Sequence, residues 1–65
     1  MQKLPNIWSM WQHHNGNVYR VLMLANVDSN HPCYQVTVIY EDSNGKVWAK
    51  TLDNFMENMT EVPEC

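Results

Sequence analysis

The chain has 65 residues, enough for one small domain, and a net charge of −3. A domain of this size buries only about 60% of the surface that its unfolded chain exposes, so we expect oligomerisation to supplement the core. The acidic balance argues against nucleic acid as a partner, because domains that bind it usually carry a basic face.

The lack of a visible targeting signal and the few cysteines favour a cytoplasmic location. No signal peptide is visible and no apolar run reaches about 20 residues, so we expect neither secretion nor association with a membrane. Cys33 and Cys65 lack the spacing of a metal or redox motif. We therefore expect both to be free thiols in a reducing compartment.

A hairpin is the clearest local prediction. Residues 7–14 and 18–26 are rich in β-branched, aromatic and apolar side chains, and Asn15-Gly16 between them is typical of a tight primed turn. This predicts two antiparallel strands whose register is fixed by the turn.

Alternation along these two strands predicts which side chains share a face. Trp11 and His13 fall on one face of the first strand. If the strand continues through His14, that residue falls on the other face, and the two histidines should not chelate one ion. In the second strand, one face is predicted to carry Tyr19, Val21, Met23 and Ala25, and the other Val18, Arg20, Leu22 and Leu24.

The middle of the chain predicts a second hairpin. Residues 26–32 are dense in turn formers and read as a loop. Residues 34–40 are the strongest strand signal, with Tyr34, Val36, Val38 and Tyr40 on one face. A turn at 41–45 then leads into a strand at 46–50.

The C-terminal part predicts a helical turn and a last strand. Thr51 or Asp53 can cap a turn whose apolar residues follow helical spacing, namely Leu52, Phe55, Met56 and Met59. We expect this stripe to cover the open end of a sheet, and residues 60–62 to return as a short strand.

Together these elements predict an all-β fold, a small SH3-like antiparallel barrel of about five strands with one short helical turn near the C-terminus. We expect residues 1–65 to form this single domain, with residues 1–6 and 63–65 loosely held.

Two stretches resemble a small bacterial and phage family, Domain of Unknown Function 1653. Its pattern Y-x-H-x-K-G-N-x-Y-x-V-L aligns without gaps on residues 11–22, and its pattern W-V-R-P-L-E-x-F aligns on residues 48–55. Between them, the V-V-Y-x-x-L-Y run is similar to residues 34–40. The departures are Trp11, Asn15, Lys50 and Thr51. The resemblance implies a small β-rich module of phage or bacterial origin, and no established reaction.

The aromatic side chains are the most informative functional feature. They are too many to hide on one face of so small a core, although any one ring can belong to the core: Trp8, Trp11, Tyr19, Tyr34, Tyr40 and Trp48. An exposed ring beside a basic residue stacks a planar group and pairs with an anion, and such stacking is worth about 1–3 kcal/mol per base.

We therefore predict a non-enzymatic binding module that holds a small planar anionic ligand of nucleotide type, as an oligomer able to sequester a host signal. The predicted ligand-binding residues are Trp11, His13, Tyr19, Arg20, Trp48 and Lys50. No cofactor, metal ligand or catalytic residue is predicted.

Two other functions stay open. The exposed aromatic residues could form a patch that binds or inhibits a basic host protein, selected by the acidic surface. A small thiol or metal enzyme is the third reading, because His31 and Cys33 are close in sequence. So small a chain has little volume for an enclosed catalytic pocket, which places this reading last.

Overall fold

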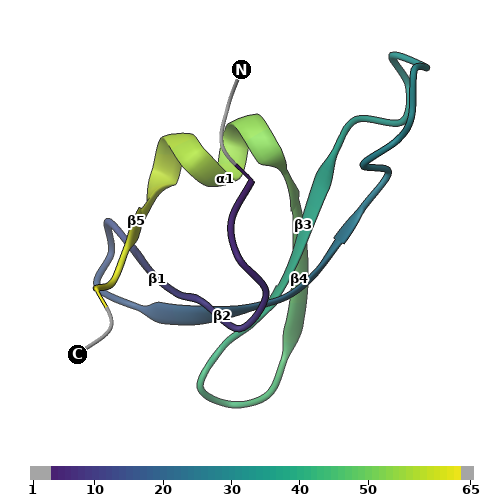
Figure 1. Ribbon diagram of the computed structural model, residues 1–65. Coiled ribbons are helices and arrows are strands. Elements are labelled where there is room, and N and C mark those ends of the chain that lie inside the picture. The colour runs from purple at the N-terminus through teal and green to yellow at the C-terminus, as the bar shows by residue number, and fades with distance from the viewer. Residues whose placement is uncertain (1–3, 64–65) are drawn as a thin grey trace.

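The computed structural model describes residues 4–63. The elements are β1 (Met10–His13), β2 (Val18–Ala25), β3 (Thr37–Glu41), β4 (Val47–Thr51), α1 (Leu52–Asn58) and β5 (Met59–Glu61). All strands belong to one antiparallel sheet with the order β4-β3-β2-β1-β5 (Figure 1). The prediction of a mostly β fold with five strands and one short helix is confirmed. Within the described residues the sheet is not closed, since β4 and β5 form its two edges.

Both hairpin turns end in a glycine with positive φ, 97° at Gly16 and 80° at Gly45. The His13 N–H donates to Asn17 O at 2.8 Å, and the Gly16 N–H donates to His13 O at 2.8 Å. Three residues therefore separate the paired positions, as in a hairpin loop with a left-handed residue at its end. The prediction of a tight primed turn is wrong, because only the glycine of Asn15-Gly16 takes a positive φ.

The first strand is shorter than predicted because the chain turns at Trp8. Trp8 has a φ of 71°, a left-handed conformation that interrupts an extended strand. The Trp8 N–H still donates to Val21 O at 2.8 Å, so the turn is tied to β2. Regular pairing begins only at Met10, opposite Arg20.

A bulge in β2 changes which residues reach the core. Val21 pairs with Tyr40 and Met23 pairs with Ile39, so Leu22 is an extra residue on β2. Such an insertion reverses the alternation beyond it. Leu24 therefore packs against the core, whereas Met23 is 56% exposed. The predicted grouping of Met23 with Tyr19 and Val21 is wrong for this reason.

The boundaries of the remaining strands differ slightly from the predicted ranges. β4 and β5 are each shifted by one residue from the predicted ranges, and β3 begins at Thr37. Tyr34 lies in the preceding loop, where its N–H donates to His31 O at 2.9 Å. Its ring is exposed, so the prediction that Tyr34 shares a face with Val38 and Tyr40 is wrong.

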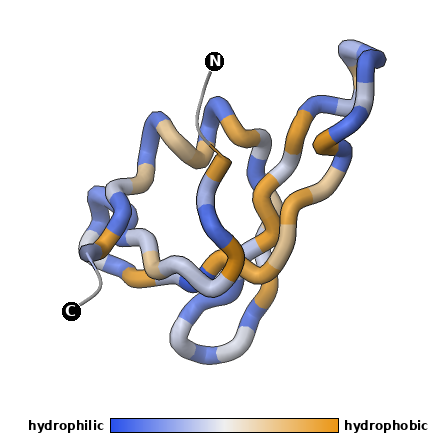
Figure 2. The backbone as a smooth tube through the Cα atoms, in the orientation of Figure 1, coloured by the Kyte–Doolittle hydropathy of each residue, from blue (hydrophilic) through white to orange (hydrophobic). Residues whose placement is uncertain are grey.

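The core lies between the sheet and α1. Its buried residues are Trp11, Val21, Val38, Tyr40, Phe55 and Met59. The Phe55 ring of α1 is central, with centroids 5.1 Å from Trp11 and 5.4 Å from Tyr40. Leu52 and Met56 pack against the same cluster, which confirms the predicted apolar stripe. The N-cap of α1 is Thr51. Figure 2 shows hydrophobic residues along the strands and hydrophilic ones at the tips of the β2–β3 and β3–β4 connections.

The ends of the described chain bear on the predicted loose termini. Residues 1–3, 64 and 65, including Cys65, lie outside the described residues. Pro5 is buried, and its segment lines a small hollow with Trp11 and Met56. Cys33 is an exposed free thiol. No helix in residues 4–63 is long and apolar enough to span a membrane.

Candidate functional site

The strand register shows which residues share each face of the sheet. Residues directly opposite one another in an antiparallel pair lie on the same face. We call the face that carries the core and α1 the inner face, and the opposite one the outer face. Trp48 lies opposite Tyr40, and Lys50 lies opposite Val38, so both belong to the inner face at the β4 edge.

Trp11 and Tyr19 are part of the inner-face packing. Trp11 is 6% exposed, and its indole Nε1 donates to Ser9 Oγ at 2.8 Å. The Tyr19 ring is half-buried, edge-on to Tyr40 at 5.2 Å. Burial and the neighbouring Tyr19 raise the pKa of Tyr40, so its phenol stays neutral. Trp11 therefore offers almost no ring surface to a ligand, and Tyr19 offers only part of its own.

His13 lies at the end of β1, opposite the buried Met59. Its Nδ1 accepts a hydrogen bond from the Asn15 N–H at 3.1 Å. His13 and His14 are predicted to point to opposite faces only if the strand runs through both, and this condition is not met, because β1 ends at His13 and the turn begins at His14. Their ring centroids are 4.0 Å apart. Within residues 4–63, no group of three His, Cys, Asp or Glu side chains could hold a metal ion.

Trp48 is 49% exposed and is held by the β3–β4 turn. Its indole Nε1 donates to Asp42 Oδ2 at 3.1 Å. Asp42 Oδ1 accepts from the backbone N–H groups of Asn44 at 2.8 Å and Lys46 at 3.0 Å. The indole hydrogen bond, followed by these backbone bonds and the charge of Lys46, lowers the pKa of Asp42. The carboxylate is thus ionised and already engaged inside the turn.

Arg20 differs from the other five predicted residues because it lies on the outer face. It pairs with Met10 of β1 and with Glu41 of β3. Its Nε donates to the Met10 Sδ at 3.2 Å, the one hydrogen bond of its side chain within the described residues. The structure therefore does not bring the six predicted residues together: Trp48 and Lys50 share one edge, and Arg20 lies on the other face.

The aromatic partner of Arg20 is Trp8, which the sequence-based site omitted. The Arg20 guanidinium carbon lies 6.0 Å from the Trp8 ring centroid, within the range of a cation–π contact. Trp8 is 61% exposed, the largest exposed fraction among the large apolar residues of 4–63. The sequence predicts an exposed aromatic ring beside a basic residue as the kind of site, and Trp8 with Arg20 is such an arrangement. The left-handed backbone of Trp8 carries no local sequence signal.

A shallow hollow of 310 Å³ adjoins Arg20 on the outer face. Its lining residues are Met10, Val18, Arg20, Glu41, Asp42 and Ser43. Arg20 supplies the positive charge, Glu41 supplies acceptor oxygens, and Val18 and Met10 supply apolar surface. We call Trp8, Arg20 and this hollow the outer-face site. It combines an exposed indole with a guanidinium that lies over the ring.

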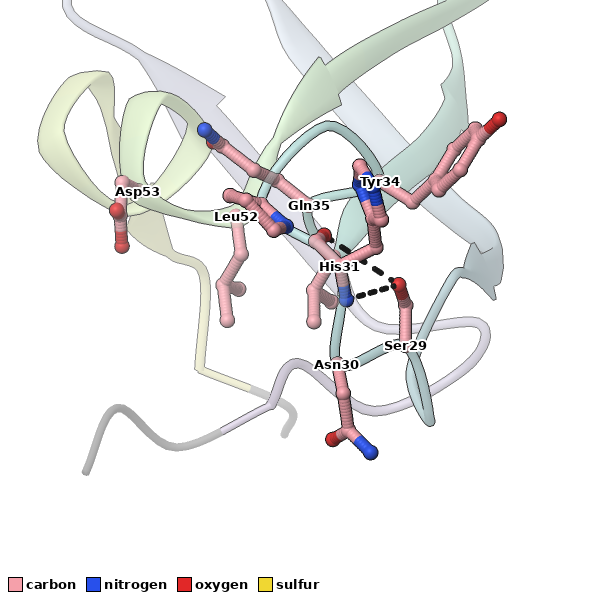
Figure 3. A pocket seen from close by; sticks show the side chains of 9 residues that line it. Ser29, Asn30, His31, Tyr34, Gln35, Leu52 and Asp53 are labelled. Atoms are coloured by element: carbon pink, nitrogen blue, oxygen red, sulfur yellow. Dashed lines mark hydrogen bonds between the residues drawn. The ribbon is translucent and has the colours of Figure 1, made fainter.

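A second hollow of 420 Å³ lies under the β2–β3 loop, next to the start of α1 (Figure 3). His31 and Ser29 are hydrogen-bonded there, and the His31 Nδ1 accepts from the Cys33 N–H at 3.1 Å. Figure 3 shows the Tyr34 ring extending away from Leu52 and Asp53. Asp53 is the charged residue of the lining, so this hollow suits an anionic ligand less well than the outer-face site does.

Comparison with known proteins identifies the family of this chain. The sequence profile of the family described as Protein of unknown function (DUF1653) matches residues 9–64. The chain belongs to this family. The match confirms the resemblance seen at residues 11–22 and 48–55, and it covers every strand of the sheet. Trp8, the aromatic member of the outer-face site, lies just before the DUF1653 match. No curated protein and no solved structure matches the chain.

Proposed function

We propose that this DUF1653 protein is a non-enzymatic binding module that holds a planar anionic group on its outer-face site. The observation that supports it is the state of Trp8, whose ring is exposed although its backbone is held in a left-handed conformation. Such a conformation costs a bulky residue about 1–3 kcal/mol, and residues held in it cluster at functional sites. An exposed ring without a binding role would give no stabilisation to offset this conformational cost.

The chemistry of the pair favours a nucleotide-type ligand. A planar base stacks on the Trp8 ring, and a phosphate or carboxylate pairs with the Arg20 guanidinium, whose planar fork suits two anionic oxygens. Glu41, which lies opposite Arg20, accepts a hydrogen bond from an amino group of the base. One stacked ring contributes about 1–3 kcal/mol, so we expect a modest affinity for a single site.

The barrel type of the fold, the origin of the protein and its cellular location are also proposals. We infer that the sheet is an SH3-like barrel left open between β4 and β5, which is supported by the strand order and by the position of α1 between the last two strands. A phage or bacterial origin and a cytoplasmic location stay predictions.

A protein partner is a second candidate, favoured by apolar side chains near the same site. Val18, Met23 and Val47 are exposed, and the register places them with Arg20 on the outer face. A basic partner would contact Glu41 as well as this apolar surface. The two functions differ in which residues matter, since a small ligand needs Trp8 and Arg20 but does not reach Met23.

Titration followed by proton–nitrogen correlation NMR tests the proposal. Each tryptophan gives its own indole N–H resonance, so Trp8, Trp11 and Trp48 report separately. Addition of ribonucleoside monophosphates should shift the Trp8 indole and the Arg20 Nε–H and leave the buried Trp11 indole in place. Nucleosides and inorganic phosphate, added separately, divide the effect between stacking and charge.

The matched variants are Arg20→Gln and Lys50→Gln, which remove the same charge at the site and on the opposite face of the sheet. Arg20→Gln should weaken binding about ten-fold, the effect of losing roughly 1.4 kcal/mol, and Lys50→Gln should not. Absence of any shift at millimolar nucleotide overturns the ligand proposal. Shifts confined to Trp48 and Lys50 would place the site on the inner edge instead.

A further inference from the structure

Within residues 4–63, no strand pairs with the outer edge of β4. β4 pairs with β3 on one side only, because it is the last strand of the sheet. The Leu52 N–H donates to Val36 O at 2.8 Å, and Lys46 O accepts from the Asp42 N–H at 3.0 Å, so these even-numbered positions point their backbone groups toward β3. Backbone direction alternates along a strand. The N–H and C=O groups of Val47, Ala49 and Thr51 therefore point to the free edge.

The two edges of the sheet are not equivalent. β5, the opposite edge, has three residues and is followed two positions later by Pro63, and short edges near a proline resist pairing. β4 has five residues in unbroken register with β3 and contains no proline. Val47 on this strand is 59% exposed. β4 is thus the edge that can accept another strand.

A second copy of β4 can pair with this edge, and an axis at the central residue Ala49 pairs all five residues of the strand. A two-fold axis normal to the sheet pairs antiparallel strands symmetrically, and it must pass through one residue of β4 for the faces to match. With the axis at Lys50, two lysines would oppose each other. With the axis at Trp48, Lys46 of one copy would oppose Lys50 of the other. Like charges directly opposite are destabilising, so both registers are disfavoured.

With the axis at Ala49, the same residues become complementary. Ala49 lies opposite its own copy, and Val47 lies opposite Thr51, so all the outward backbone groups form hydrogen-bonded pairs. On the inner face, each Trp48 ring lies opposite the Lys50 ammonium of the second copy. This pair is not hydrogen-bonded through the backbone, so its side chains approach closely, as a cation–π contact requires. The Asp42 hydrogen bond holds the Trp48 indole in position.

We propose that two copies of this chain pair antiparallel through β4 about an axis at Ala49, joining their sheets into one. The pairing goes beyond the proposed ligand site, which lies on the outer face and does not include β4. A five-residue strand pair is smaller than a standard interface, so the dimer is weak and forms in a concentration-dependent manner.

Sedimentation velocity over low micromolar to millimolar concentrations tests the dimer. The wild-type chain should shift from monomer to dimer. Ala49→Pro removes an N–H that points to solvent, and Ala49→Lys places like charges on the axis, so both should raise the dissociation constant about ten-fold or more while the circular dichroism spectrum is kept. Thr60→Lys, the matched change on β5, should leave the dimer unchanged. A wild-type chain that stays monomeric overturns the proposal, as does a dimer that tolerates both Ala49 variants.

Cross-linking tests the register, in a chain whose native Cys33 and Cys65 are replaced by serine. Paired Cα atoms at a hydrogen-bonded position lie about 5.5 Å apart, within disulfide range. Ala49→Cys should form a disulfide-linked dimer on mild oxidation. Val47→Cys alone should not, but a mixture of Val47→Cys and Thr51→Cys chains should. Cross-linking of Val47→Cys with itself would contradict the axis at Ala49.

Discussion

The Trp48 indole donates a hydrogen bond to the Asp42 carboxylate over 3.1 Å, and this contact ties the start of β4 to the turn before it. The same carboxylate accepts two backbone N–H groups of the turn. These bonds lower its pKa below the ordinary 3.8, so the charged form is favoured by folding.

A pH dependence follows. Because the folded-state pKa of Asp42 lies below its unfolded value, its stabilising contribution is fully present above about pH 4 and is lost as the pH falls through the folded-state pKa. Asp42→Asn should therefore be less stable than the wild type at neutral pH, and the difference should shrink in acid. Urea unfolding at several pH values measures it, with Asp28→Asn in the β2–β3 loop as control. A difference independent of pH would show that the charge is not involved.

Substitution of Gly16 tests the backbone geometry of the first hairpin loop. Gly16 has a φ of 97°, and no heavy atom lies within 4 Å of a Cβ placed on it. The cost of Gly16→Ala is then one of backbone conformation, about 1–2 kcal/mol. Gly16→Asn should cost less, since asparagine tolerates the left-handed region. Equal losses for the two variants in thermal unfolding would argue against a left-handed residue at this position.

Substitution of Phe55 tests how much the packing of the core contributes to stability. It is fully buried and contacts the rings of both Trp11 and Tyr40. Phe55→Ala should lower the free energy of unfolding by about 3–5 kcal/mol, which is comparable to the whole stability of so small a domain. Phe55→Leu gives a milder variant that stays measurable by urea unfolding. Met23→Ala, exposed because of the β2 bulge, should change stability by less than about 0.5 kcal/mol.

The left-handed backbone at Trp8 reverses the usual order of stability of glycine and alanine variants. In most strands alanine is preferred to glycine, but at a φ of 71° alanine keeps the strain and glycine removes it. Trp8→Gly should therefore be more stable than Trp8→Ala by about 1 kcal/mol, because both lose the same ring contacts. The reverse order in chemical unfolding would mean that the backbone at Trp8 is not left-handed in solution.

Much of the fold could be predicted because it depends on local signals. Alternating apolar residues, two Asn-Gly turns and a helical apolar stripe identified five strands and α1 within a few residues. The errors have non-local causes. The bulge at Leu22 arises from pairing with β3, and the turn at Trp8 is held by a hydrogen bond to Val21.

The candidate site was harder to predict for the same reason. The sequence suggested an exposed aromatic ring beside Arg20, and the structure has one, but the ring is Trp8 rather than Trp11. Alternation from the turn places Trp11 and Arg20 in neighbouring strands without showing that β1 carries Trp11 into the core. The burial of Trp11 depends on Phe55, which is far away in sequence.

The most direct test of the outer-face site compares nucleotide binding by the wild type and by Trp8→Gly, with the unfolding free energy measured on the same samples. We expect Trp8→Gly to bind ribonucleoside monophosphates about ten-fold more weakly or not at all, while it remains folded and at least as stable as Trp8→Ala. Equal affinity of a folded Trp8→Gly and the wild type would contradict it.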